Sequence, residues 1–135
     1  MLSQRIQVLS PSLTLAITAL ARDLKAQGRD ILSFSAGEPD FDTPQRVKDA
    51  AITAIQEGCS KYTAVAGTPE VLKAVAGKLK RENNLDYKPS QIVVNVGAKH
   101  SLFNIFQAII DEGDEVIIPS PYWVTYPELV VYSGG

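Results

Sequence analysis

The chain has 135 residues, enough for one ordinary domain, and its 45% hydrophobic and 21% charged residues are an ordinary balance for a soluble globular protein. The net charge is only −2 and there is no run of basic residues, so neither a nucleic acid nor an anionic membrane is expected as a partner. Cys59 is the only cysteine, which excludes an internal disulfide and favours a reducing, cytoplasmic location.

The N-terminal region predicts an arm followed by a helix. Residues 1–11 have weak periodicity, whereas apolar residues recur at helical spacing over 13–24, and Gly28 supplies a C-terminal stop. The same apolar stretch resembles the core of an export signal, but Ser10-Pro11-Ser12 interrupts it. We therefore expect an amphipathic helix and not an export signal. No stretch is long enough to span a bilayer.

A short β-like run over 31–34 leads into a turn-rich loop over 35–44. Thr43 is expected to cap the next helix, with Pro44 in its first position and Gly58 at its end.

A second loop covers 59–67, and Thr68-Pro69-Glu70 then repeats the pattern of a capping residue followed by proline. The acidic residue in the first turn suits the helix dipole. This helix is expected to end near Asn83-Asn84.

The last third of the chain alternates strands and helices. Residues 91–96 are a β-branched run typical of a buried parallel strand, and Gly97 then opens a helix. A second strand is expected over 115–118, with a final helix from about Pro127 to a stop at Gly134-Gly135. This alternation predicts an α/β layer with a right-handed crossover.

The turn at Gly97-Ala98-Lys99 is the first candidate site. A helix N-terminus presents free backbone N–H groups and a partial positive charge, and a glycine lets a phosphate approach closely. A tight turn that needs glycine only for its backbone angles explains the same residues equally well. The turn matches neither the GxGxxG fingerprint nor the GxxxxGK[ST] phosphate loop.

Three further residues are candidates for binding. Trp123 follows a predicted strand and either stacks on a planar ring or packs in the core. Tyr62 lies in a polar loop, as a hydrogen-bond donor or as a surface aromatic, and the freedom of Gly37 suggests that its backbone approaches a ligand. The carboxylates are scattered and His100 is the only histidine, so no metal site is expected.

Together these pieces resemble the fold-type-I, pyridoxal-phosphate-dependent class I/II aminotransferases, and within them the bacterial-type aspartate aminotransferases. The match runs in order through the whole chain. Its motifs are the arm with Pro11-Ser12, Ser35-Ala36-Gly37-Glu38-Pro39-Asp40-Phe41-Asp42-Thr43-Pro44, Lys61-Tyr62-Thr63 with Ala66-Gly67, Val96-Gly97-Ala98-Lys99, Gly113-Asp114-Glu115-Val116, and Pro119-Ser120-Pro121-Tyr122-Trp123-Val124.

The resemblance implies an incomplete α/β fold. Residues 1–30 would be an N-terminal arm and helix belonging to the small-domain segment, and residues 31–135 part of the large domain with its parallel sheet. A sheet left with open edges would make the isolated chain poorly soluble or partly unfolded.

The resemblance also implies a role for each candidate. Gly97, Ala98 and Lys99 would wrap the phosphate of pyridoxal 5'-phosphate, and Trp123 would stack on its ring. Tyr62 would reach the phosphate bound by the neighbouring subunit, which implies a homodimer. Gly37, Trp123 and Lys99 would contact the substrate, with Lys99 facing the distal carboxylate of aspartate or glutamate.

The implied reaction transfers an amino group between an amino acid and a 2-oxo acid. The family's Schiff-base lysine lies far downstream and is not Lys99, so the chain by itself is expected to be inactive and to be an N-terminal fragment. An aromatic or alanine aminotransferase of the same fold, or a non-catalytic remnant, are the alternatives. Ser10 stands where relatives that accept prephenate tend to carry a basic residue, which argues against that substrate.

Overall fold

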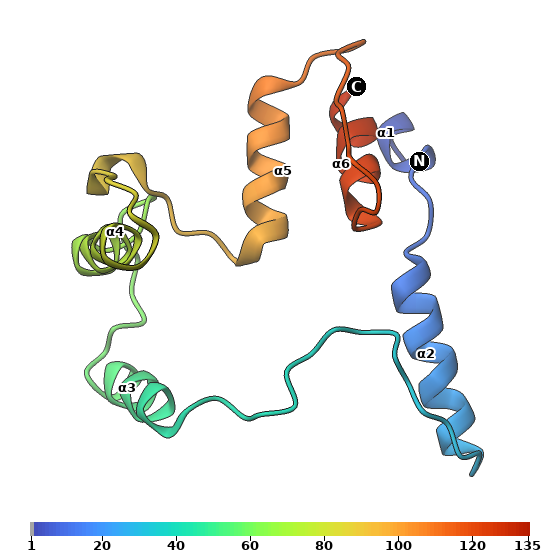
Figure 1. Cartoon of the computed structure of the whole chain (residues 1–135), viewed down its shortest axis with the longest axis horizontal. Helices are drawn as coiled ribbons and strands as arrows, with labels where there is room; N and C mark the ends of the chain where they lie inside the picture. The colour runs from blue at the N-terminus through green and yellow to red at the C-terminus, as the bar shows by residue number, and fades with distance from the viewer. Residues whose placement is uncertain (1) are drawn as a thin grey trace. The chain divides into compact units, whose positions relative to one another are not determined.

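A computed structural model describes residues 2–135, and the regular structure in that range is helical (Figure 1). The elements are α1 (Gln4–Gln7), α2 (Leu13–Ala26), α3 (Gln45–Gln56), α4 (Pro69–Asn83), the 3₁₀ turn η1 (Pro89–Gln91), α5 (Gly97–Ile109) and α6 (Thr125–Ser133). They form two compact units: one combines the segment ending at Pro39 with Lys99–Gly135, and the other is Asp40–Ala98.

The strands expected over 31–34, 91–96 and 115–118 are not formed in the described part of the chain. These segments are extended or irregular, and η1 takes the first residue of the second one. Ile92 has strand-like angles of φ −119° and ψ 135°, yet no ladder forms. A β-strand needs a neighbouring strand for its backbone N–H and C=O groups, and the local β-branched pattern cannot supply one.

In the unit Asp40–Ala98, the start of α3 differs from the expectation. Pro44, at φ −52° and ψ 138°, is the N-cap and no side chain caps the helix, so the prediction of Thr43 as cap is wrong. The Thr43 N–H instead donates to Asp42 Oδ1 at 2.8 Å. A hydrogen bond from Lys48 and this Thr43 N–H together lower the pKa of the Asp42 carboxyl.

The predicted start of α4 is confirmed. Thr68 Oγ1 accepts the N–H of Val71 at 3.4 Å, and Pro69 occupies the first helical turn. The helix ends at Asn83, and Asn84 takes the left-handed conformation with φ 54°, as expected for a residue that closes a helix. Local capping chemistry therefore fixes both ends of this helix.

Replacing Thr68 with alanine should destabilise α4 by about 1 kcal/mol, because one N–H of the first turn loses its acceptor. We expect amide hydrogen-exchange protection in α4 to fall about fivefold. The pKa of Glu70 is lowered by its own backbone N–H and by the Thr68 hydroxyl, so the same variant should raise it in an NMR titration. Thr68→Ser keeps the acceptor and should leave both quantities nearly unchanged.

In the other unit, α5 and α6 pack through side chains. The rings of Phe103 and Tyr132 lie 5.6 Å apart at 43°, and Gln107 Nε2 donates to Ser133 Oγ at 2.8 Å. The only buried hydrophobic residues among residues 2–135 are Ile110, which follows α5, and Val130, which lies in α6. These side-chain contacts join the second half of α5 to the C-terminal half of α6.

Gly134 completes the α5–α6 contact. It ends α6 with φ +111°, and a Cβ added there would lie 3.3 Å from the backbone of Glu112. Its carbonyl accepts the N–H of Gly113 at 2.9 Å. The predicted helix stop is therefore confirmed, although α6 begins at Thr125, two residues before the expected start.

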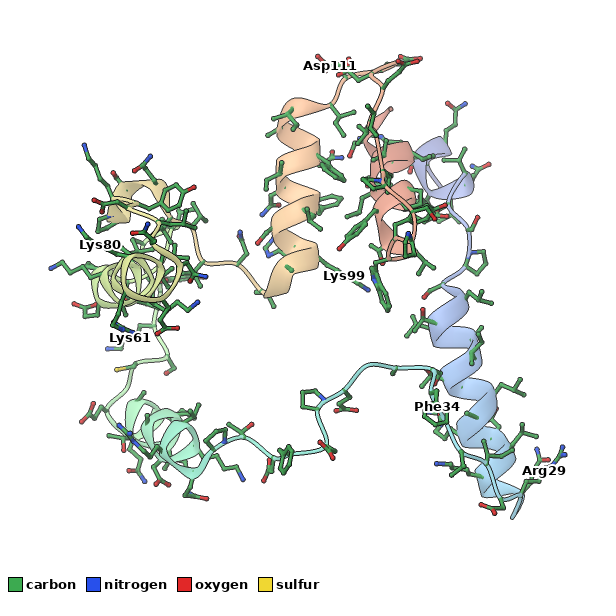
Figure 2. All side chains as sticks on the ribbon, viewed as in Figure 1. Arg29, Phe34, Lys61, Lys80, Lys99 and Asp111 are labelled. Atoms are coloured by element: carbon green, nitrogen blue, oxygen red, sulfur yellow. The ribbon has the colours of Figure 1, made fainter. Side chains whose placement is uncertain are left out.

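The N-terminal segment follows the prediction in part. Residues 1–11 were expected to be an irregular arm, but α1 forms within them and contacts α6. The expected helix is α2, and the Ser12 hydroxyl caps it by accepting the Leu15 N–H at 3.4 Å. The segment carrying Phe34 runs beside α2 (Figure 2) and leaves that side chain 95% exposed.

Candidate functional site

Lys99 and Trp123 lie together in one pocket. The Lys99 Nζ atom is 5.6 Å from the centre of the Trp123 ring, within the range of a cation–π interaction. The pocket has a volume of about 400 Å³, in the range of small-molecule sites. We call it the Lys99 pocket; it is lined by Ser10, Pro11, Ser12, Leu13, Thr14, Leu15, Lys99, Trp123, Val124, Thr125 and Glu128.

Local structure explains how the two side chains meet. Gly97 opens α5 with φ +81°, a conformation that a residue with a Cβ rarely adopts, so Lys99 falls in the first helical turn. Trp123 stands two residues before α6 and its carbonyl accepts the Tyr126 N–H at 3.0 Å. Because α5 and α6 pack against each other, the starts of both helices face the same pocket.

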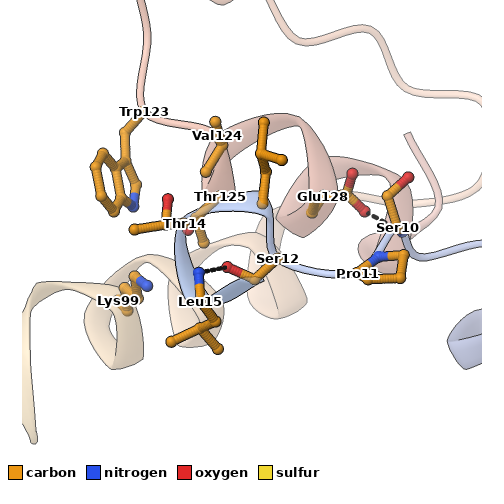
Figure 3. A pocket seen from close by; sticks show the side chains of 11 residues that line it. Ser10, Pro11, Ser12, Thr14, Leu15, Lys99, Trp123, Val124, Thr125 and Glu128 are labelled. Atoms are coloured by element: carbon orange, nitrogen blue, oxygen red, sulfur yellow. Dashed lines mark hydrogen bonds between the residues drawn. The ribbon is translucent and has the colours of Figure 1, made fainter. Parts of the chain in front are cut away.

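The N-terminal arm supplies the other wall (Figure 3). Ser12 and Thr14 bring hydroxyl groups to the pocket from the start of α2, and Thr125 brings one from α6. Glu128 accepts the backbone N–H of Ser10 at 3.0 Å through Oε2. The pocket therefore combines one cation, one carboxylate already engaged by the arm, several hydroxyls and an aromatic face.

These groups fit an anionic ligand with a planar ring. Trp123 remains 43% exposed, so part of its ring is free to take a further contact. A Cβ built on Gly97 would meet no atom within 4 Å, so the backbone at the start of α5 is open to close approach.

The remaining predicted site residues lie outside the Lys99 pocket. Gly97 and Ala98 begin α5 but do not line it. Gly37 lies between α2 and α3 with open space where its Cβ would be, and it does not line the pocket either. Tyr62 belongs to the other unit, fully exposed in the loop before α4. Of the predicted set, the structure brings Lys99 and Trp123 together.

Sequence reasoning missed two contributions to the pocket. Ser12 carried a usable signal, because a serine before an apolar periodic run is a typical N-cap and so marks the start of α2. Glu128 carried none, since its partner Ser10 is 118 residues away along the chain.

Residues 2–135 contain neither a metal-binding cluster nor a membrane-spanning helix. Histidine, cysteine and carboxylate side chains nowhere gather in a group of three that could hold a metal ion. Within the same residues, every helix is too short or too polar to cross a membrane.

Comparison with known proteins identifies the family. The sequence profile described as aminotransferase class I and II matches residues 29–135. The chain is 56% identical over 135 residues to the aspartate aminotransferase of Bacillus sp. (strain YM-2). It is 58% identical over 134 residues to the probable aspartate/prephenate aminotransferase of Aquifex aeolicus. These matches take in 100% and 99% of the chain but 34% of each relative.

The backbone agrees with solved aminotransferases. It superposes on the Thermus thermophilus aspartate aminotransferase with maleate at a TM-score of 0.96, with 52% identity over 100% of this chain and 35% of that one. A Methanococcus jannaschii protein described as similar in its active site to kynurenine aminotransferases gives 0.91 at 32% identity, covering 99% of this chain and 36% of that one. The chain spans about a third of the length of its relatives, and it belongs to the class I and II aminotransferase family.

Proposed function

We propose that the full-length protein containing this chain transfers an amino group between a dicarboxylic amino acid, aspartate or glutamate, and a 2-oxo acid, using pyridoxal 5'-phosphate. The observation that carries the proposal is the Lys99 ammonium beside the Trp123 ring in one pocket of about 400 Å³. Family membership supports the class of reaction, and the names of the relatives, aspartate aminotransferases among them, support the substrates.

The cofactor would be held by residues at two helix starts. Gly97, Ala98 and Lys99 in the first turn of α5 would wrap the phosphate. The backbone N–H groups of Ala98 and Lys99 would be the donors, because the Gly97 N–H already donates to the Asn95 carbonyl at 2.9 Å. Trp123 would stack on the pyridine ring. When bound, pyridoxal 5'-phosphate supplies the electron sink for the carbanion that amino transfer requires. Tyr62 would reach the phosphate held by the neighbouring subunit, so the active form would be a homodimer.

Lys99 would serve mainly as a substrate-binding residue. Its side chain lines the pocket with Nζ over the Trp123 ring, which supports a model in which the ammonium would face the substrate while the backbone would face the phosphate. An ammonium there would bind the distal carboxylate of a dicarboxylic substrate. The Thermus thermophilus structure was solved with maleate, which is itself a dicarboxylate. Gly37 would contact the substrate through its backbone.

In the full-length protein, this chain would form part of a larger α/β fold. Residues 31–135 would contribute extended segments to a parallel sheet of the large domain, and residues 1–30 an arm and helix. The remaining two thirds of the relatives' length would supply the neighbouring strands and the Schiff-base lysine. Residues 1–135 by themselves would then have no transaminase activity. The single, exposed thiol of Cys59 suits a reducing, cytoplasmic location.

Replacing Lys99 with methionine tests the substrate assignment in the full-length protein. The change keeps an unbranched side chain that is shorter by one atom and removes its charge, so we expect KM for aspartate to rise about tenfold or more. The KM for alanine, which lacks a distal carboxylate, should change less than about twofold. Steady-state rates measure both, with 2-oxoglutarate held at a saturating concentration for each variant because this acceptor also carries a distal carboxylate.

Lys25→Met is the matched control, because Lys25 lies in the last turn of α2 and does not line the pocket. It should leave both KM values at the wild-type level. If aspartate ranks below the aromatic amino acids in wild-type kcat/KM, the dicarboxylate assignment is wrong. If the wild-type protein shows no amino transfer with any donor, the proposed reaction is wrong.

A further inference from the structure

A hydrogen bond joins the N-terminal arm to α6. The backbone N–H of Ser10 donates to Glu128 Oε2 at 3.0 Å, and both residues line the Lys99 pocket (Figure 3). The donor and acceptor are 118 residues apart along the chain. The acceptor is a carboxylate of α6 that lines the pocket.

The contacts around this hydrogen bond place the arm beside the Lys99 pocket. α1 contacts α6, so the arm lies along the helix that carries Glu128. Two residues after Ser10, the Ser12 hydroxyl caps α2, and Ser12 also lines the pocket. Ser10 is therefore bonded to α6, and the chain enters α2 three residues later. Pro11 between them restricts the backbone further.

We propose that Glu128 is a positioning residue: by accepting the Ser10 N–H it anchors the arm as a wall of the Lys99 pocket, and so tunes binding of the part of the substrate that reaches Lys99. The proposal rests on the proposed function, because it assigns the pocket to a dicarboxylic substrate. Glu128 makes no chemical step of its own. It acts through the arm that it holds.

The first test compares Glu128→Ala and Glu128→Gln in the full-length protein. Without an acceptor the arm loses its anchor, and we expect KM for aspartate to rise about five- to tenfold while kcat stays within about twofold. The KM for alanine should stay within about twofold, because alanine does not extend to this wall. Glutamine retains a side-chain oxygen that accepts the Ser10 N–H and should largely restore the wild-type KM.

The donor side of the bond provides an independent variant. Ser10→Pro removes the N–H and leaves Glu128 in place, so it should reproduce the rise in KM of Glu128→Ala. The double variant should have the same KM for aspartate as either single variant, because both substitutions delete the same hydrogen bond. If the rise in KM of the double variant equals the product of the two single rises, the two residues act independently and the proposed anchor is wrong. Glu57→Ala, at the exposed C-cap of α3, is the control and should match wild type.

A readout independent of activity separates this proposal from the proposed function. Trypsin cleaves after Arg5, which lies in α1, and an arm without its anchor should be cut about five- to tenfold faster in Glu128→Ala. An unchanged cleavage rate overturns the anchor even if the enzyme transaminates aspartate. Faster cleavage in a protein that turns over no dicarboxylate supports the anchor and contradicts the proposed substrate.

Discussion

Purified by itself, the chain of residues 1–135 should unfold over a broad range of urea concentration, without one cooperative transition. Within residues 2–135, Ile110 and Val130 are the only buried hydrophobic side chains. Large apolar residues are left open, among them Phe34 at 95% and Ile117 at 93% exposure. A cooperative transition requires a core whose burial offsets the entropy of ordering the chain, and this chain buries too little apolar surface.

Circular dichroism and tryptophan fluorescence give the measurement. The helical signal at 222 nm should decline gradually, and Trp123 fluorescence should change at different urea concentrations from it. The full-length protein, in which the exposed apolar segments would be covered, should give one steep transition by both probes. A sharp and coincident transition for the monomeric 135-residue chain would show that this expectation is wrong.

Replacing Trp123 with alanine should weaken binding of pyridoxal 5'-phosphate to the full-length protein about ten- to hundredfold, because stacking of an aromatic side chain on a planar base contributes about 1–3 kcal/mol. The side chain is 43% exposed, so its removal leaves little cavity in the fold. Equilibrium titration followed by cofactor absorbance measures the dissociation constant, whether or not the variant retains activity.

Two further variants make the Trp123 experiment specific. Trp123→Phe keeps a smaller aromatic face and should stay within about fivefold of the wild-type dissociation constant. Tyr87→Ala removes an aromatic side chain of similar exposure from the segment before η1 and should have no effect on cofactor binding. A Trp123→Ala protein that binds cofactor with wild-type affinity would contradict the stacking role.

Helix ends that depend on neighbouring residues in the chain could be predicted from the sequence. The start of α4 follows from Thr68 and Pro69, whose side chains act within one helical turn. The start of α5 follows from Gly97, the residue type that most readily takes its φ of +81°. Thr43 shows the limit of this reasoning, since Asp42 engages its N–H and the helix begins from Pro44 without a side-chain cap.

The sequence by itself determined the family, the helices α2 to α6, and the residue types suited to a phosphate, a planar ring and a carboxylate. Only the tertiary structure decided that the run over 91–96 forms no strand in this chain, because a strand depends on a partner that local pattern cannot provide. Only the tertiary structure placed Lys99 beside Trp123 and joined Ser10 to Glu128. Such contacts depend on how α5, α6 and the arm pack, and residues over a hundred positions apart leave no local pattern.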